Sequence, residues 1–466
     1  MAITLSPQQD AAILGFREWY RSLPERTYTH TKTVFASDGT PTEVPVYSRG
    51  LETAPFFLLN GFAGTGKSTV LPYLVEATGL NPHQIVYCAP TGKAAKVMTR
   101  KMRDEGLDTR ATTIHKAIYR PKALKAYQIE NELFAAQAEY KIACTEGNPI
   151  TIRELKGKIS QLEKNLERAY DENSPAFQLD VDSMAASGAW LFIVDECSMV
   201  DADMADDLRS FGVPILAIGD PGQLPPISLS GPGFCNRDPD AALTEIHRQA
   251  LDNPIIWASM LIREGQDVPM GSHGDGALRV IDREDDDITY NLEVDKQIIV
   301  GTHEKRWQIT RKLRKMEGYH GLGPAEGEFM MITKNSRLFP DLVNGSMVFM
   351  TADVGPLRPG NVTFAGSVED DEGKTYTLKC LQATIEEHYN GKNNASAHKR
   401  DVFRAKQDDR THELDFAYAI TCHKAQGSQW DEVVVHDQSN VFRKDASRWL
   451  YTAVTRAAER LTLVMQ

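Results

Sequence analysis

The sequence lacks the features that mark secreted, membrane-spanning or metal-stapled proteins. Its first residues show no basic stretch followed by an apolar one, so nothing indicates a secretion signal. No apolar run approaches the length that spans a bilayer. The cysteines form no C-x-x-C pair and have no histidine cluster nearby, which argues against a zinc site or a disulfide framework; they are Cys88, Cys144, Cys197, Cys235, Cys380 and Cys422. We therefore expect a cytoplasmic protein without a membrane partner.

The sequence has no excess of positive charge: 64 Asp and Glu outnumber 52 Lys and Arg, so the formal net charge is -12 over 466 residues. This balance disfavours a nucleic-acid binder, whose phosphate contacts need Lys and Arg, unless the basic residues are grouped. Residues 303–315 form one such group, with six Lys or Arg against one Glu. A solvated helix face and a strand-contacting face explain this group equally well. The length exceeds what one hydrophobic core supports, which predicts two to four domains.

The segment 61–69, G-F-A-G-T-G-K-S-T, matches the phosphate-loop pattern G-x-x-x-x-G-K-[ST] between an apolar run and a helical pattern. Backbone N–H groups of such a loop close around a phosphate chain at the positive end of the following helix. Lys67 would bridge the terminal phosphates, and the Ser68 hydroxyl would ligate Mg²⁺. The loop therefore predicts binding of ATP with Mg²⁺, through Gly61, Gly64, Gly66, Lys67, Ser68 and Thr69.

Two further polar segments follow apolar runs that read as strands. Residues 191–196, L-F-I-V-D-E, end in two carboxylates. Asp195 would hold Mg²⁺ directly or through water, and Glu196 would orient and deprotonate the attacking water. Residues 217–226 contain Asp220 and Gln223, whose side-chain amide could read the γ-phosphate and report its loss.

Two arginines are candidates for stabilising the transferred phosphate. Arg248 lies in L-T-E-I-H-R-Q and Arg456 in Y-T-A-V-T-R-A, both far along the chain from the phosphate loop. An arginine finger must be delivered to the γ-phosphate from outside the loop that binds it. Taken singly, each would be read as an ordinary surface arginine.

The order of apolar runs and helical patterns predicts an α/β fold with two domains, each interrupted by an insertion. Strands of a parallel sheet are expected at 56–60, 84–89, 190–195 and 214–219, after a helix at 5–23 and a β-hairpin within 28–49. Helices at 123–143 and near 152–166 predict a helical insertion. A Gly/Pro-rich link at 228–239 precedes a second α/β region that starts near Leu243 and includes a strand at 297–301. Residues 328–405 are β-rich, and the α/β pattern resumes at Leu414 and ends with a strand at 461–465.

Four more segments complete an ordered series: 5–12 (L-S-P-Q-Q-D-A-A), 89–95 (A-P-T-G-K-A-A), 113–116 (T-I-H-K) and 419–430 (A-I-T-C-H-K-A-Q-G-S-Q-W). Together with the phosphate loop, the D-E pair and the two arginines, the series resembles superfamily 1 helicases. The sequence of residues 89–95 favours the 1B branch, which includes RecD and the phage helicase Dda.

The resemblance implies two RecA-like domains, 1A and 2A, with a mainly helical insertion 1B and an SH3-like β insertion 2B. Their bounds would be 1–114 with 186–235 (1A), 115–185 (1B), 236–327 with 406–466 (2A) and 328–405 (2B). It also implies that Gln9 reads adenine and that Gln429 contacts the nucleotide. DNA would contact Thr91, Lys93, Thr113, His115, Thr421 and His423.

The activity implied by this resemblance is ATP-driven translocation on single-stranded DNA in the 5′→3′ direction, with unwinding at junctions between single- and double-stranded DNA. Further implied properties are a monomeric state, a partner such as a single-stranded-DNA-binding protein or a replisome component, and a phage origin with action in the host cytosol. A nucleotide-dependent DNA clamp or switch without unwinding activity is the alternative. The sequence also leaves RNA open as the track.

Replacing Arg248 or Arg456 by alanine should lower kcat for ATP hydrolysis by about 10³-fold, because each would remove charge stabilisation from the transition state. Nucleotide affinity should change much less. Steady-state ATPase rates at saturating single-stranded DNA measure the effect. Normal turnover would assign the replaced arginine a structural role.

Overall fold

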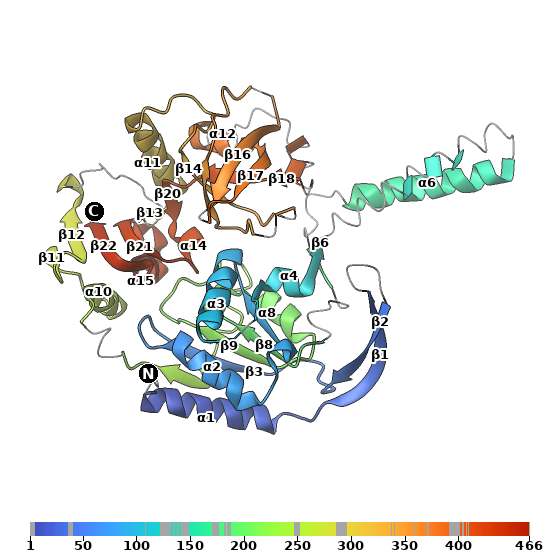
Figure 1. Ribbon diagram of the computed structural model, residues 1–466, viewed down its shortest axis with the longest axis horizontal. Coiled ribbons are helices and arrows are strands. Elements are labelled where there is room, and N and C mark those ends of the chain that lie inside the picture. The colour runs from blue at the N-terminus through green and yellow to red at the C-terminus, as the bar shows by residue number, and fades with distance from the viewer. Residues whose placement is uncertain are drawn as a thin grey trace. The chain divides into compact units, whose positions relative to one another are not determined.

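The computed structural model describes residues 5–35, 41–107, 109–121, 132–133, 136–137, 139–140, 149–169, 177–180, 183, 188–246, 252–285, 296–336, 338–339, 341–358, 360–370, 372–390, 401–402, 405–406, 408 and 410–465. The chain forms two compact units (Figure 1). One contains Met1–Thr113 with Ala189–Gln466, and the other contains Ile114–Gly188.

The first sheet of the larger unit is entirely parallel, in the order β10-β3-β9-β8-β4-β5. Its strands are β3 (Phe56–Gly61), β4 (Ile85–Ala89), β5 (Thr112–Thr113), β8 (Leu191–Val194), β9 (Ile215–Gly219) and β10 (Ala241–Leu243). The central strands are almost continuous apolar runs, as expected for a sheet that is covered on both faces. The four predicted strands are therefore confirmed.

Three helices share one apolar core with this sheet: α1 (Pro7–Ser22), α2 (Lys67–Thr78) and α3 (Gly92–Asp104). Another helix, α8 (Ala202–Arg209), follows β8. The start of α1 is set by a capping box, in which Ser6 accepts a hydrogen bond from the N–H of Gln9 and the Gln9 side chain accepts one from Ser6. This confirms the helix predicted at 5–23.

The start of the second α/β region was predicted wrongly. Leu243 was expected to open that region, but it lies in β10, which pairs with β3 in the first sheet. The preceding Gly/Pro-rich segment is anchored to the same sheet, because Phe234 is buried and the N–H of Leu58 donates to the Asp240 carboxylate at 2.7 Å. These long-range contacts leave no trace in local composition.

The second sheet has the order β11-β12-β22-β21-β13-β20, and all its pairs are parallel except β11 with β12. Its strands are β11 (Gly271–His273), β12 (Leu278–Asp282), β13 (Lys296–Val300), β20 (Ala419–Thr421), β21 (Trp430–His436) and β22 (Ala457–Met465). The helices of this region are α10 (Pro254–Arg263), α11 (His303–Met316), α14 (Cys422–Ala425) and α15 (Ala446–Val454). Two parallel sheets with flanking helices confirm the predicted fold class.

A third sheet, in the order β18-β17-β16-β15-β14-β19, makes up the β-rich insertion. It contains β14 (Phe329–Ile332), β15 (Met347–Met350), β16 (Thr363–Asp370), β17 (Thr375–Leu381), β18 (Thr411–His412) and β19 (Leu414–Phe416), with α12 (Gln382–Asn390) after β17. The prediction that the α/β pattern resumes at Leu414 was wrong. Residues 414–416 pair antiparallel with β14, and the parallel sheet resumes at β20.

A buried charge cluster joins this third sheet to α11 and α14. The Arg306 guanidinium lies 2.7 Å from the Asp415 carboxylate, His388 also contacts that carboxylate, and the Lys424 ammonium lies 3.8 Å away. Burial alone would raise the pKa of Asp415, but the charges of Arg306, His388 and Lys424 hold it well below its usual range. Arg314 of α11 is likewise buried against Glu328. Part of the basic run 303–315 is therefore internal, an arrangement that neither sequence interpretation anticipated.

Replacing Asp415 by asparagine should destabilise this region by about 3 kcal/mol, because it leaves buried positive charge without its partner. The midpoint of urea unfolding, followed by circular dichroism, measures the effect. The matched control is Asp341→Asn, which removes an exposed partner of Lys374 in the same sheet region and should leave the midpoint unchanged. Equal midpoints for the two variants would show that the buried cluster does not stabilise the fold.

The smaller unit contains α4 (Ile114–Ile118), β6 (Tyr119–Pro121), α6 (Pro149–Ala169) and β7 (Phe177–Leu179). The long helix α6 confirms the helix predicted near 152–166. Most of the helix expected at 123–143 lies outside the described residues, although 132–133, 136–137 and 139–140 are helical. The antiparallel pair of β6 with β7 was not predicted. The division into 1A, 1B, 2A and 2B stays a prediction.

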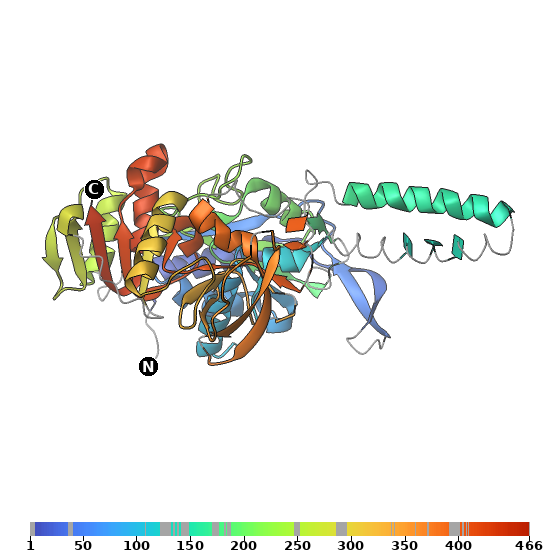
Figure 2. The ribbon, with the colours of Figure 1, turned by 90° about the horizontal axis from the view of Figure 1, so that it is seen from above.

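The predicted N-terminal hairpin is present as β1 (Thr27–Phe35) paired antiparallel with β2 (Pro41–Ser48). Its expected turn lies outside the described residues. Both ribbon views show this hairpin extending away from the first sheet (Figures 1 and 2). Among the described helices, none combines the length and apolar character needed to cross a membrane.

Candidate nucleotide and DNA site

The phosphate loop connects the end of β3 to the start of α2, as predicted. Gly64 and Gly66 both have φ of +79°, a left-handed conformation that favours glycine. A Cβ at Gly61 would lie 2.7 Å from the Thr65 hydroxyl and 2.9 Å from Cγ of Lys67. All three glycines are therefore required by the geometry of the loop. Thr69 lies half-buried in the first turn of α2.

The ammonium group of Lys67 is held by the loop itself. It donates to the carbonyl of Gly61 at 2.6 Å and to that of Phe62 at 3.0 Å. It also lies 3.9 Å from the carboxylate of Asp220, at the end of β9. These contacts place a positive charge at the mouth of the loop, where a phosphate chain would be bound.

Asp195 and Glu196 follow β8 directly. The N–H of Glu196 donates to the Asp195 carboxylate at 2.9 Å, and Glu196 itself has the left-handed angles φ 53° and ψ 39°. Such backbone conformations cost about 1–3 kcal/mol in non-glycine residues and cluster at functional sites. Burial and the neighbouring Glu196 charge raise the pKa of Asp195, while the charges of Lys101 and Lys67 lower it.

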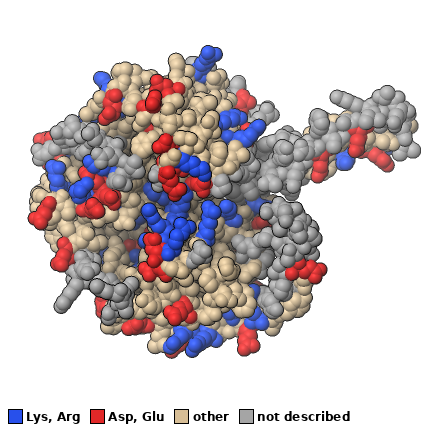
Figure 3. All heavy atoms as spheres, viewed as in Figure 1, with Lys and Arg blue, Asp and Glu red and all other residues tan. Residues whose placement is uncertain are grey.

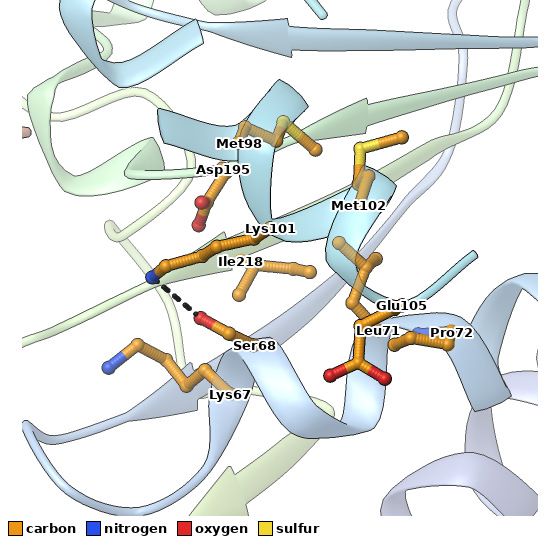
Figure 4. A pocket seen from close by; sticks show the side chains of 10 residues that line it. All are labelled: Lys67, Ser68, Leu71, Pro72, Met98, Lys101, Met102, Glu105, Asp195 and Ile218. Carbon is orange, nitrogen blue, oxygen red and sulfur yellow. Dashed lines mark hydrogen bonds between the residues drawn. The ribbon is translucent and has the colours of Figure 1, made fainter. Parts of the chain in front are cut away.

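A small pocket lies beside these groups, between α2 and α3 (Figure 4). Ser68, Asp195 and Lys101 all line it, and the Lys101 ammonium donates to the Ser68 hydroxyl at 3.1 Å. Lys101 was not singled out in the sequence. Its basic character is unremarkable within α3, and only the fold brings it to a residue 33 positions earlier in the chain.

The donor set of this pocket suits a magnesium-bound nucleotide. A serine hydroxyl and a carboxylate are the hard oxygen ligands that Mg²⁺ prefers, and it keeps several waters and substrate phosphates beside them. The side-chain carbonyl oxygen of Gln223 is buried and has no hydrogen-bond partner within the described residues. A buried unpaired acceptor is costly, which supports a ligand-related role for Gln223.

Tyr451 connects the phosphate loop to the second α/β region. Its hydroxyl accepts a hydrogen bond from the N–H of Ala63 at 2.9 Å and donates one to the Asp220 carboxylate at 2.8 Å. Burial raises the pKa of Asp220, whereas Lys67 and this hydroxyl lower it. Tyr451 belongs to α15, 388 positions after Ala63. Nothing in the sequence indicated this role, because the tyrosine's partners lie hundreds of positions earlier in the chain.

The turn after Asp220 is held by the same region. The N–H of Leu224 donates to the Thr452 hydroxyl at 2.8 Å, and the Gln426 amide donates to the Leu224 carbonyl at 3.0 Å. A Cβ at Gly222 would lie 3.0 Å from the Tyr451 ring. The turn that carries Asp220 and Gln223 is therefore in direct contact with α15 and with the residue that follows α14.

The predicted adenine-reading residue is buried at the edge of the loop. The Gln9 side chain donates to the Thr65 carbonyl at 3.4 Å, and its neighbour Gln8 accepts from the N–H groups of Thr244 and Glu245. Gln8 thus anchors the segment that leads to Arg248. Gln429 is exposed at the start of β21.

The two predicted arginine fingers have different outcomes. Arg248 lies outside the described residues. Arg456 is buried, and its guanidinium donates to the carbonyls of Thr452 and Ser428 and to the Thr455 hydroxyl. In this arrangement Arg456 stabilises the end of α15. A finger role would require these hydrogen bonds to be exchanged, and it stays a prediction.

Several predicted DNA contacts lie where the two α/β regions meet. Thr91 caps the N-terminus of α3, and the Lys93 ammonium lies 4.2 Å from the centre of the Trp430 ring. A Cβ at Gly427 would lie 3.3 Å from the Thr91 hydroxyl, so the segments 91–94 and 427–430 are in contact. α3 carries five basic residues and one acidic residue, and Lys and Arg side chains gather over it (Figure 3).

The other predicted DNA contacts are less exposed. Thr113 is buried in β5, beside Ala89, and Thr421 is buried at the start of α14. His423 lies 5.7 Å from the Phe442 ring, and burial lowers its pKa, so it is neutral at pH 7. His115 belongs to the smaller unit, in which its ring lies 5.2 Å from that of Tyr119.

Two protein families match the sequence: residues 50–277 match the AAA domain, and residues 416–464 match the UvrD-like helicase C-terminal domain. The ATP-dependent RecD2 DNA helicase of Deinococcus radiodurans is 26% identical over 420 residues, which cover 86% of this chain and 46% of that helicase. The chain therefore spans about half the length of this relative.

Solved helicase structures are also similar over most of the chain. The Pif1 helicase of Candida albicans is 17% identical, with a TM-score of 0.45, over 99% of this chain and 95% of that chain. A structure of two coordinating Pif1 helicases at forked double-stranded DNA is 16% identical, with a TM-score of 0.47, over 99% of this chain and 92% of that chain.

The fold and the site define a phosphate-loop protein with two α/β regions, each built on a mainly parallel sheet. The two matched domains and the RecD2 relative support the resemblance to superfamily 1 helicases of the RecD-like 1B type. The roles of the individual site residues stay predictions.

Replacing Tyr451 by phenylalanine should lower kcat/KM for ATP hydrolysis by about ten-fold, because a hydrogen bond to a charged group contributes roughly 1.5–3 kcal/mol. Steady-state ATPase assays measure the loss. Tyr87→Phe is the matched control, since the buried Tyr87 hydroxyl has no hydrogen-bond partner in the described part of the chain. Wild-type kcat/KM in Tyr451→Phe would mean that the link between Ala63 and Asp220 is not used in the reaction.

Proposed function

We propose that this protein is an ATP-dependent DNA helicase that translocates on single-stranded DNA and unwinds adjoining duplex. The main support is the Tyr451 hydroxyl, which joins the phosphate loop and Asp220 of the first α/β region to α15 of the second. A motor needs a nucleotide site that is contacted by two regions, so that hydrolysis changes the relation between them. The RecD2 relative is named as an ATP-dependent DNA helicase.

The residues on the first region would bind and activate the nucleotide. Phosphate oxygens would replace the loop carbonyls as partners of Lys67, and Ser68 and Asp195 would hold Mg²⁺. The metal, when bound, would neutralise charge that develops on the transferred phosphoryl group. Glu196, which follows Asp195 and has a left-handed backbone, would take the proton of the attacking water.

Changes at the phosphate would reach the second region through the Asp220 turn. The Asp220 carboxylate contacts both Lys67 and Tyr451, and the turn that follows is bound by Thr452 and Gln426. When Lys67 exchanges its partners for phosphate, the balance of charge at Asp220 changes, and the position of α15 would change with it. A two-state shift of this kind couples chemistry to movement.

The track would be single-stranded DNA lying across the contact between 91–94 and 427–430. Lys93 and the basic face of α3 supply phosphate contacts, and Trp430 offers an aromatic face once Lys93 moves. His423 is neutral, so it would contribute a hydrogen bond rather than a charge. Junctions of single- and double-stranded DNA are the proposed substrate. A single-stranded-DNA-binding protein or a replisome component is the proposed partner.

We expect the purified protein to unwind duplexes with a 5′ single-stranded tail and to leave 3′-tailed duplexes intact, because the family branch moves 5′→3′. Strand displacement on the two substrates, with excess ATP, measures the direction. Lys67→Ala is the control that abolishes hydrolysis while keeping the DNA-contacting residues. Unwinding of 3′-tailed duplexes alone would contradict the predicted direction.

A second assay separates the helicase from the alternative clamp or switch. ATPase rates measured with and without single-stranded DNA should differ strongly for a motor, since the track completes its cycle. DNA-independent hydrolysis without strand displacement on either substrate would overturn the proposed function and favour a switch.

A further inference from the structure

Lys101 lies in the last turn of α3 and reaches into the pocket beside the phosphate loop. Its ammonium donates to the Ser68 hydroxyl at 3.1 Å, and the same pocket is lined by Asp195. Figure 4 shows the ammonium group between the Ser68 hydroxyl and the Asp195 carboxylate. These two side chains are the proposed ligands of Mg²⁺, and the Lys101 ammonium contacts the first of them directly.

The second lysine of the site has a different set of partners. Lys67 is bound by the carbonyls of its own loop and lies near Asp220, and it is the lysine of the phosphate-loop pattern. Lys101 is not part of that pattern. Of the two lysines, Lys101 has the larger electrostatic effect on Asp195, so the phosphate-loop pattern does not account for the main positive charge near Asp195.

Mg²⁺ and the Lys101 ammonium would both use the Ser68 oxygen. A magnesium ion needs a lone pair of this hydroxyl directed at the metal, and in this structure the hydroxyl accepts from Lys101. Two cations within a few ångströms of each other also repel, with solvent reducing the repulsion because the Lys101 and Ser68 side chains are exposed. Binding of one cation therefore opposes binding of the other.

We propose that Lys101 is a built-in cation that holds the Ser68 hydroxyl beside Asp195 before nucleotide binds, and that Mg²⁺ competes with it for the Ser68 oxygen. This inference rests on the proposed ATPase function. Lys101 is then a positioning residue that sets how strongly nucleotide binding depends on magnesium. Glu105, the residue that caps the C-terminus of α3 and also lines the pocket, offers a new partner for the displaced ammonium.

The competition also has a consequence for the DNA track. Lys101 is on the same helix as the proposed DNA contacts Thr91 and Lys93, at a distance of about 15 Å along the axis. Release of Lys101 by a magnesium-bound nucleotide would free one end of α3. The other end contacts residues 427–430 of the second α/β region. One rigid helix thus links the metal ligands to the track.

The test is equilibrium binding of the fluorescent nucleotide mant-ADP to the full chain, once with excess Mg²⁺ and once with excess EDTA. The quantity compared is the ratio of the dissociation constant in EDTA to that in Mg²⁺. Lys101→Met should increase this ratio by about five-fold, the size expected for a partly exposed charge interaction. Lys101→Arg keeps the charge and should retain the wild-type ratio. Lys96→Met, an exposed lysine of the same helix that does not line the pocket, should also retain it.

Two outcomes would overturn the competition. An unchanged ratio in Lys101→Met would mean that Lys101 and Mg²⁺ do not compete. Weaker binding both with Mg²⁺ and with EDTA would instead make Lys101 a phosphate ligand. A failure of wild-type protein to bind mant-ADP under either condition is a distinct result, because it would overturn the proposed ATPase function itself.

Thermal unfolding without nucleotide gives a second readout that does not depend on nucleotide binding. Lys101→Met should lower the Tm in EDTA, because Asp195 loses a compensating charge and Ser68 loses a hydrogen bond. Mg²⁺ alone should raise the Tm of this variant more than that of the wild type. Equal responses of the two proteins to Mg²⁺ would overturn the proposed competition, and circular dichroism verifies that both are folded.

Discussion

The site combines two carboxylates, the buried Asp220 and the half-buried Asp195, whose negative charge must be balanced by positive charge. Asp195 and Asp220 end neighbouring strands of the first sheet, and burial raises the pKa of both. Lys67 faces Asp220, and Lys101 faces Asp195 through the pocket that both line. Lys67 is also held by two carbonyls of the phosphate loop, which phosphate oxygens would replace, and Lys101 by the Ser68 hydroxyl, a proposed Mg²⁺ ligand. Nucleotide binding would therefore change the partners of both lysines.

This constraint explains how a change at the bound phosphate could alter contacts with the second α/β region. The Asp220 carboxylate is shared between Lys67 and the Tyr451 hydroxyl, so a change in one partner alters the other. Lys101 connects the opposite side of the pocket to α3, whose first turn contacts residues 427–430. Two separate routes thus lead from the phosphate loop to the second α/β region. The first route consists of hydrogen bonds, and the second consists of the Lys101–Ser68 hydrogen bond, the helix α3 and its contact with residues 427–430.

The sequence predicted those parts of the fold and site that are local in the chain. The parallel strands are apolar runs, the phosphate loop is a contiguous pattern, and the start of α1 follows from a capping box. The missed features join distant segments. Tyr451 lies 231 positions after its partner Asp220, and Lys101 lies 33 positions after its partner Ser68. β10 follows the Gly/Pro-rich link but pairs with β3, which lies far before it in the sequence. Asp415 likewise looked like part of a new α/β strand because its buried partners, Arg306 and His388, are far away in sequence.

The use of basic residues inside the fold bears on how an acidic protein could hold DNA. Arg306, Arg314 and Arg456 are buried and bound to acids or carbonyls, so they are not free to contact phosphate. His423 is neutral because burial lowers its pKa. The basic face of α3 then becomes the main source of positive charge at the proposed track. A grip that depends on few charges should be weak, and its dependence on salt should be shallow, because that dependence scales with the number of phosphates contacted. Such a weak contact with the strand is also broken easily, as the proposed translocation requires once in every ATPase cycle.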